Sequence, residues 1–132
     1  MSEEIAHDIR AFLLAYVESY EQLEILLLLH REAAAWQPPG VADALKIPLS
    51  SAAASLDELA ARGLLRRERG GYRFDPGDPS VACLVAGLAR AYEERRVAVI
   101  DLMSANAMDR IRRSALRTFA EAFRLRGTKK DG

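Results

Sequence analysis

The side chains that could carry nucleophilic or metal chemistry are few in this 132-residue sequence and lie far apart. There are two histidines, His7 and His30, and one cysteine, Cys83. The carboxylate at helical ligand spacing from a histidine is Glu3, four residues before His7, and a metal site needs more ligands than this pair. Cys83 lies in an apolar segment with no histidine near it, which favours a core position over a nucleophile. We therefore predict no metal site, no cofactor, no catalytic residue and no enzymatic activity.

A different chemistry, the binding of nucleic-acid phosphates, is indicated around two short predicted helices. Residues 41–45 place apolar side chains at helical spacing, and Pro48 ends this helix because proline disfavours the helical conformation in the residue before it. A second helix follows, with Ser50 or Ser51 as its cap and Gly63 at the left-handed position after its end. Two helices with a tight turn between them form a helix-turn-helix.

A hairpin is predicted directly after these helices. Strands over residues 64–69 and 72–75 flank Gly70-Gly71, a pair that tolerates the positive φ angles of a type I′ turn. In the corresponding register Arg69 pairs with Tyr72. This register creates two opposite-charge pairs, Glu68 with Arg73 and Arg66 with Asp75. We therefore expect two of the four hairpin arginines to be partly neutralised, and Arg67 and Arg69 to stay free.

In this order of elements, residues 19–76 resemble the winged helix-turn-helix domains of small bacterial transcription regulators, broadly the MarR-like and ArsR-like group. The residues that carry the resemblance are ALKIP before the second helix, L-x-x-L followed by A-R-G-L-L at its end, and the Gly-Gly hairpin with Tyr72 and Phe74 behind it. The resemblance implies a DNA-binding transcription regulator that acts as a dimer on double-stranded DNA. Winged helices also serve as protein–protein interaction modules with little or no DNA binding, and this alternative stays open.

The second helix lacks the side chains that usually read bases. In related domains base contacts come from the first two turns, which here offer Leu49, Ser50, Ser51, Ala53, Ala54 and Ser55. None of these is an arginine, lysine, asparagine or glutamine, the residues that make bidentate base contacts. Binding would then depend on phosphate contacts, which orient a protein on DNA without specifying sequence. We assign these contacts to Lys46, Ser50, Ser51, Arg66, Arg69 and Arg73.

Two helices are predicted before this segment. Apolar residues recur at helical spacing over residues 3–17. Ser19 and Gln22 have the spacing of a capping box and open a helix that extends to about Ala35. Because this second helix is apolar nearly all round, we expect it to lie at the centre of the core. The core should join Leu26, Leu28, Leu56, Leu59, Leu65 and Phe74.

Two helices are predicted after the hairpin, the first of them long. Asp78 and Pro79 suit a helix start, and the apolar pattern continues to about Met103. A break over residues 104–108 separates this helix from a last one over residues 109–126, and residues 127–132 form a tail. Such a long apolar stripe suggests a homodimer contact. The predicted interface residues are Val85, Leu88, Tyr92, Val99 and Met103, and another protein could dock on the same C-terminal helices.

The predicted fold class is therefore mainly α, a winged helix-turn-helix with a two-stranded hairpin wing, an extra N-terminal helix and two C-terminal helices. Residues 1–132 form a single domain, divided into residues 1–18, 19–76, 79–126 and 127–132. The formal net charge is zero, yet residues 1–36 carry −5 and residues 79–132 carry +5. With one cysteine, no signal peptide and no long apolar run, we expect a cytoplasmic protein without a membrane partner.

Overall fold

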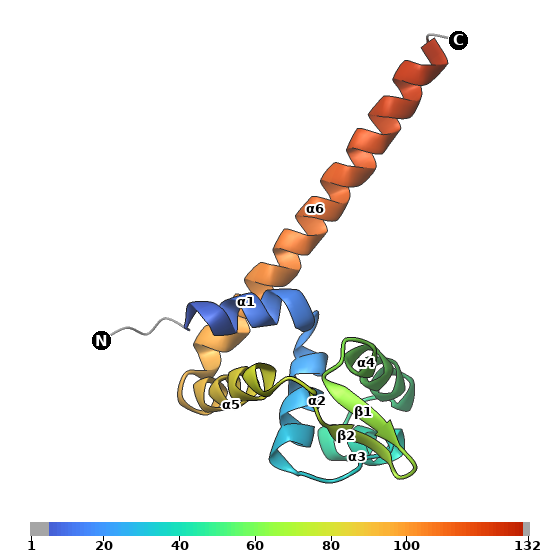
Figure 1. Ribbon diagram of the computed structural model, residues 1–132. Coiled ribbons are helices and arrows are strands. Elements are labelled where there is room, and N and C mark those ends of the chain that lie inside the picture. Colours follow the sequence, from blue (N-terminus) through green and yellow to red (C-terminus); the bar gives the residue numbers. More distant parts are fainter. Residues whose placement is uncertain (1–5, 131–132) are drawn as a thin grey trace.

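The computed structural model describes the backbone of residues 6–130 and the side chains of residues 6–122. Within this range the chain forms six helices and one antiparallel hairpin, which confirms the mainly α class. The elements in order are α1 (His7–Tyr16), α2 (Tyr20–Arg31), α3 (Pro38–Leu45), α4 (Leu49–Ala61), β1 (Leu65–Glu68), β2 (Gly71–Phe74), α5 (Pro79–Glu94) and α6 (Arg96–Lys130). Figure 1 shows α1 to α5 and the hairpin gathered into one body, from which α6 projects as a long rod. The predicted N-terminal helix is observed from His7, and residues 3–5 lie outside the described range.

Helix α2 is the centre of the core, as its composition predicts. Six consecutive or near-consecutive apolar side chains are buried on it, namely Leu23, Ile25, Leu26, Leu27, Leu28 and Leu29. Its start is capped by Ser19, whose Oγ accepts a hydrogen bond from the Gln22 backbone N–H at 3.1 Å. Around it, Leu56, Leu59 and Leu65 are buried and Phe74 is half-buried against them. The predicted core is confirmed in these elements.

Helix α2 ends at Arg31, four residues earlier than predicted. The chain must leave the helix there because Trp36 pairs with Tyr72 of β2 as an isolated β-bridge. The Trp36 N–H donates to the Tyr72 carbonyl and the Tyr72 N–H donates to the Trp36 carbonyl, both at 2.7 Å. This main-chain tie fixes an extended segment before α3.

The two helices that follow are joined by a short turn. Helix α3 begins at Pro38, earlier than predicted. Proline is tolerated at the first helical position because a backbone N–H there would have no acceptor within the helix. It ends at Leu45 and is followed by Lys46, whose φ of 58° lies in the left-handed region. The predicted serine cap of α4 is wrong, because Pro48 occupies the N-cap position and Ser50 and Ser51 lie inside the first turn. Gly63, with φ of 83°, ends α4 as predicted.

The hairpin forms, but in a different register from the predicted one. Cα partners are Leu65 with Phe74, Arg66 with Arg73, Arg67 with Tyr72 and Glu68 with Gly71. The turn is therefore Arg69-Gly70, and Gly71 belongs to β2. Gly71 has φ of 124°, and a Cβ added there would lie 2.2 Å from the Trp36 carbonyl oxygen. The second glycine is needed for close approach of the Trp36 backbone, and this contact sets the register.

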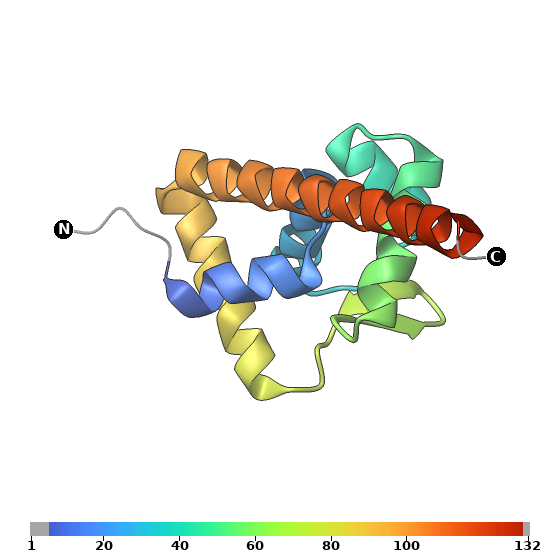
Figure 2. The same ribbon diagram turned by 90° about the horizontal axis from the view of Figure 1, so that it is seen from above.

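The C-terminal part also differs from the prediction. The break lies at Arg95, and α6 then continues without interruption through residues 104–108 to Lys130, so that the second helix is the long one. Residues 93–96 are all charged, and turning there lets the apolar residues of both helices pack on one core. Figure 2 shows this sharp turn between α5 and α6, with α1 crossing α5. The predicted tail is helical up to Lys130, and residues 131–132 lie outside the described range.

The start of α5 follows the prediction. The Asp78 carboxylate accepts a hydrogen bond from the Ser80 backbone N–H at 2.9 Å, and Pro79 is the first helical residue. This contact lowers the pKa of the Asp78 carboxyl. Among the described residues, no helix has both the length and the apolar composition required to cross a bilayer.

Candidate nucleic-acid interface

The C-terminal end of α4 is tied to the linker between α1 and α2. Arg62 follows the last residue of α4 and donates from Nη1 to the Tyr16 carbonyl at 2.9 Å and to Gln22 Oε1 at 3.0 Å. Its other guanidinium nitrogen, Nη2, pairs with the Glu18 carboxylate. Gln22 is only 4% exposed and also donates to Glu58 of α4. This partly buried network holds α4 in place against the body of the protein.

Helix α6 contacts the same linker from its own side. Arg110 donates to the carbonyls of Leu14 at 2.8 Å, Val17 at 3.0 Å and Glu18 at 3.1 Å. These carbonyls lie at the C-terminal end of α1, where backbone acceptors lack helical partners and a cation is favoured. Glu18 therefore meets Arg110 through its backbone and Arg62 through its side chain, which connects α6 to α4 through one short segment.

The start of α4 presents an uncharged surface. Leu49 is 53% exposed, Ser50 is exposed and Ser51 is half-exposed. Ser55, one turn later, is buried, and its hydroxyl donates to Glu21 of α2 at 3.3 Å. Of the serines in this helix, only Ser50 and Ser51 are thus accessible to a ligand.

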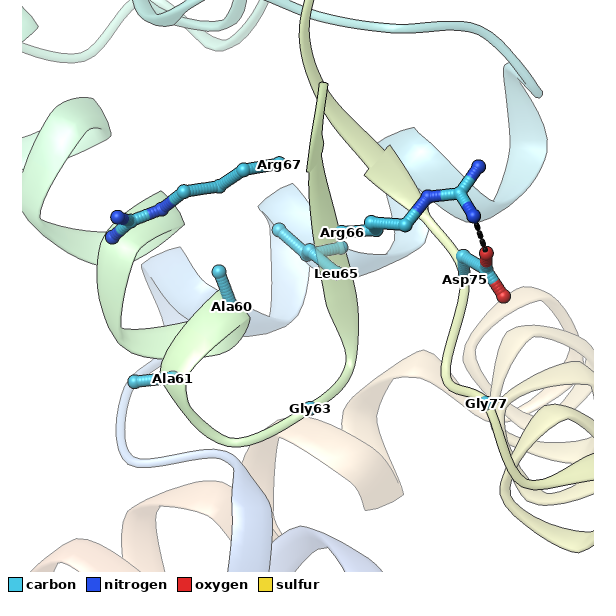
Figure 3. Close-up of a pocket in the computed structure, with 8 residues that line it drawn as sticks. All are labelled: Ala60, Ala61, Gly63, Leu65, Arg66, Arg67, Asp75 and Gly77. Atoms are coloured by element: carbon cyan, nitrogen blue, oxygen red, sulfur yellow. Dashed lines mark ion pairs between the residues drawn. The ribbon is translucent and has the colours of Figure 1, made fainter.

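The hairpin arginines are largely paired with acids. Glu68 accepts from Arg73 Nε at 2.8 Å and from Arg66 Nη2 at 3.1 Å. These contacts, that of Arg66 first, lower the pKa of the Glu68 carboxyl. Arg66 also pairs with Asp75 at 3.2 Å, as Figure 3 shows. The two predicted charge pairs are therefore present, although Arg66 and Arg73 face each other directly and reach their acids diagonally.

A third pair, which sequence reasoning missed, joins the hairpin to α4. Arg67 Nη2 lies 2.8 Å from Asp57 Oδ1, and its guanidinium lies 5.8 Å from the centroid of the Tyr72 ring. The Tyr72 hydroxyl also donates to Asp57, and this hydrogen bond raises the pKa of Tyr72. Asp57 is ten residues from Arg67, and no local pattern in the sequence indicates their contact.

Two basic residues of this region remain unpaired. Lys46 lies in the turn before α4 and Arg69 at the tip of the hairpin, and both are exposed. Across residues 6–122, where side chains are described, neither forms an ion pair or a side-chain hydrogen bond. Of the predicted phosphate-binding residues, Lys46, Arg69 and the two accessible serines are free, whereas Arg66 and Arg73 would have to exchange acidic partners for phosphates.

An open hollow of about 680 Å³ lies between the end of α4 and the hairpin. Figure 3 shows its lining, in which Arg66 and Asp75 form an ion pair and most other residues are small. The described residues contain no group of three or more histidines, cysteines or carboxylates that could hold a metal ion. The hollow therefore brings together a charged pair and apolar walls, without an unpaired nucleophile or base.

The predicted dimer residues belong to the core of the single chain. Val85, Leu88, Val99 and Met103 are buried, which leaves them no surface for a second copy. Tyr92 is half-buried, and its hydroxyl lies 2.7 Å from that of Tyr20. The large apolar side chains that stay exposed on α6 lie mostly further along the helix.

Comparisons with protein-family models, with curated proteins and with solved structures found no match to this chain.

Proposed function

We propose that this protein is a DNA-binding transcription regulator of winged-helix type that acts as a dimer. The observation that carries the proposal is the arrangement of α3, α4 and the hairpin. Two short helices meet at a tight turn, the second presents its first turn to solvent, and a hairpin follows at once. The β-bridge between Trp36 and Tyr72 adds a third extended segment beside the hairpin, between α2 and α3. The sequence resemblance over residues 19–76 supports the same function.

In this proposal the affinity for DNA comes mainly from phosphate contacts. Lys46 and Arg69 are free to make them, and the Ser50 and Ser51 hydroxyls can add hydrogen bonds. Arg66 and Arg73 contribute less, because each must leave Glu68. Exposed ion pairs are worth only about 0–1 kcal/mol, so a phosphate can displace them. The expected binding is weak, strongly dependent on salt and poorly selective for sequence.

A second candidate function is a protein–protein interaction module on the same fold. It is favoured by the pairing of Arg66, Arg67 and Arg73 with acids, which leaves this surface with little net positive charge. The exposed Leu49 at the start of α4 is the kind of apolar side chain that a protein partner would cover. A measurement of binding to duplex DNA distinguishes the two functions.

The test is the salt dependence of binding to a generic DNA duplex, measured by fluorescence anisotropy. Each phosphate neutralised contributes about −0.9 to the slope of log K against log salt, so a dimer using two cations per copy should show a slope of roughly −3 to −4. Replacing Lys46 and Arg69 together by alanine should flatten this slope strongly. The matched control replaces Arg10 and Arg90 together by alanine. These substitutions remove the same charge from exposed positions of α1 and α5 and should leave the slope nearly unchanged. If the wild-type protein does not bind any duplex at low salt, the proposal fails in favour of the interaction module.

A further inference from the structure

The distal half of α6 carries large apolar side chains that stay mostly exposed in the single chain. Ile111 is 65% exposed and Phe119 is 67% exposed, and Met108 is also mostly exposed. In Figure 1 this part of the helix stands clear of the body. Nearer the body, Arg110 of α6 donates hydrogen bonds to the linker after α1. An exposed apolar row on a projecting helix is typical of a surface that another helix covers.

The separations between the residues of this apolar row are the same whether they are counted from its N-terminal or its C-terminal end. Its members are Met108, Ile111, Ala115, Phe119 and Ala122, separated by three, four, four and three residues, and the exposed Leu116 lies outside it. At 100° per residue they fall within an arc of about 80° on one side of the helix. Val99 and Met103, which α6 buries in the core, lie on the other side. The row is thus symmetric about Ala115 and separate from the face that holds α6 to the body.

This symmetry suits a second copy of α6 running in the opposite direction. With the twofold axis at Ala115, Ile111 of each copy lies beside Phe119 of the other, and Met108 lies beside Ala122. Large side chains then meet smaller ones, and the small alanines at the centre allow the two backbones to approach closely. A twofold contact requires such a self-complementary surface.

The charges along the chain favour the antiparallel direction. Residues 123–130 contain Arg124, Arg126, Lys129 and Lys130 and no acid, whereas residues 100–107, which lie opposite them in an antiparallel pair centred on Ala115, contain the exposed Asp101 and no base. Two parallel helices would place their basic ends side by side, which like-charge repulsion disfavours. Antiparallel helices place the basic end of each copy beside residues 100–107 of the other, where residue 129 falls level with Asp101. Asp101 lines an open groove of about 490 Å³ together with the exposed Val97 and the charged residues 93–96 of both signs.

We propose that α6 pairs with α6 of a second copy in an antiparallel contact centred on Ala115. This inference rests on the proposed function for the role of the dimer, whose contact it locates, but it does not require that the dimer bind DNA. The two copies would carry their α3–α4 and hairpin surfaces at opposite ends of the shared helix pair.

Disulfide trapping in a Cys83→Ser background tests the direction and the register. Ala115→Cys should form a linked dimer on mild oxidation, because residue 115 of each copy faces the other. Ile111→Cys alone should not, because antiparallel pairing displaces its two copies by eight residues, or about 12 Å, beyond the reach of a disulfide. A mixture of Ile111→Cys and Phe119→Cys proteins should link. Arg117→Cys, on the opposite side of the helix, is the control that measures how fast disulfides form by random collision.

The dimer itself is measured by light scattering on the full chain. The wild-type protein should have twice the chain mass, and Ile111→Glu with Phe119→Glu should give a monomer with unchanged circular dichroism, because both side chains are exposed in the single chain. Arg113→Glu with Arg117→Glu, on the opposite face, should stay dimeric. A monomeric wild type, a dimer that persists in the Ile111/Phe119 variant, or efficient linking through Ile111→Cys alone would each overturn the proposal.

Titration of a DNA duplex with the same proteins separates the two proposals. If Ala115→Cys forms a linked dimer and the protein does not bind DNA, the helix pairing is supported and the proposed function is refuted. DNA binding by a wild-type protein that stays monomeric retains the DNA-binding part of the proposed function and overturns the helix pairing.

Discussion

Replacing Gly71 by alanine should destabilise the protein much more than the same change at the neighbouring Gly70. At Gly71 the added Cβ would lie 2.2 Å from the Trp36 carbonyl oxygen and 2.9 Å from the Gln37 backbone nitrogen. These atoms belong to backbone and cannot turn aside as a flexible side chain would. The methyl group can be accommodated only if β2 and the Trp36 segment separate.

The cost can be worked out from the contacts that such a separation removes. The β-bridge holds two hydrogen bonds of 2.7 Å between Trp36 and Tyr72, each worth about 0.5–1.5 kcal/mol net. Gly71 also has φ of 124°, a conformation that costs an alanine about 1–3 kcal/mol. Together these losses predict a decrease of about 2–6 kcal/mol in the free energy of unfolding.

Gly70→Ala is the matched control. Gly70 lies in the turn without a positive φ, and its added Cβ would lie 3.3 Å from the Ala35 Cβ, a tight contact that a small shift relieves. We expect a change below about 1 kcal/mol. Urea unfolding followed by the fluorescence of Trp36, the single tryptophan of the chain, measures both variants. If Gly70→Ala costs as much as Gly71→Ala, both glycines belong to the turn and the register described here is wrong.

Three further predictions concern the core residue Leu59, the hydrogen bonds of Arg62 at the end of α4, and the pKa of Glu68 in the hairpin. Leu59→Ala should lower the free energy of unfolding by about 2–5 kcal/mol because Leu59 is fully buried, whereas Leu49→Ala should change it by less than about 0.5 kcal/mol, both by urea unfolding. Arg62→Ala should cost about 1–3 kcal/mol by the same assay because the buried Gln22 loses one of its donors and the Tyr16 carbonyl loses its side-chain donor, and a loss near zero would contradict the network. The Glu68 pKa is lowered on folding, so its stabilising effect is present above the unfolded pKa and is lost as the pH falls through the lower folded value. The free energy of unfolding of Glu68→Gln should therefore depend less on pH below the ordinary glutamate pKa of 4.5, and an identical pH profile would refute the pairing of Glu68 with its two arginines.

Much of the local structure could be predicted because it depends on neighbours within one or two helical turns. Ser19, Gly63 and the Asp78-Pro79 pair mark helix ends through contacts with residues close in sequence. The apolar composition of α2 likewise predicts its central place, since a helix with no polar face has to be covered on all sides.

The candidate interface was predicted less completely, because its charges depend on contacts across the fold. The basic residues of the hairpin were identified from the sequence, and so were two of their acidic partners. The pairing of Arg67 with Asp57 was not, since it requires the hairpin to lie against α4. As a result, Arg67 was expected to be free and is paired, and Lys46 and Arg69 remain as the unpaired cations of this surface within residues 6–122.

By itself, the sequence determined the helices, the hairpin and the central place of α2, because periodicity and capping act between residues that are close along the chain. The tertiary structure decided the features that join distant segments. The approach of Trp36 to Gly71 set the hairpin register and ended α2 early, and the shared core placed the break at Arg95. The physical reason is that backbone pairing and core burial are decided by which segments meet in space, and a hydrogen bond or a steric contact between residues 35 or 36 positions apart leaves no periodic signal in the sequence.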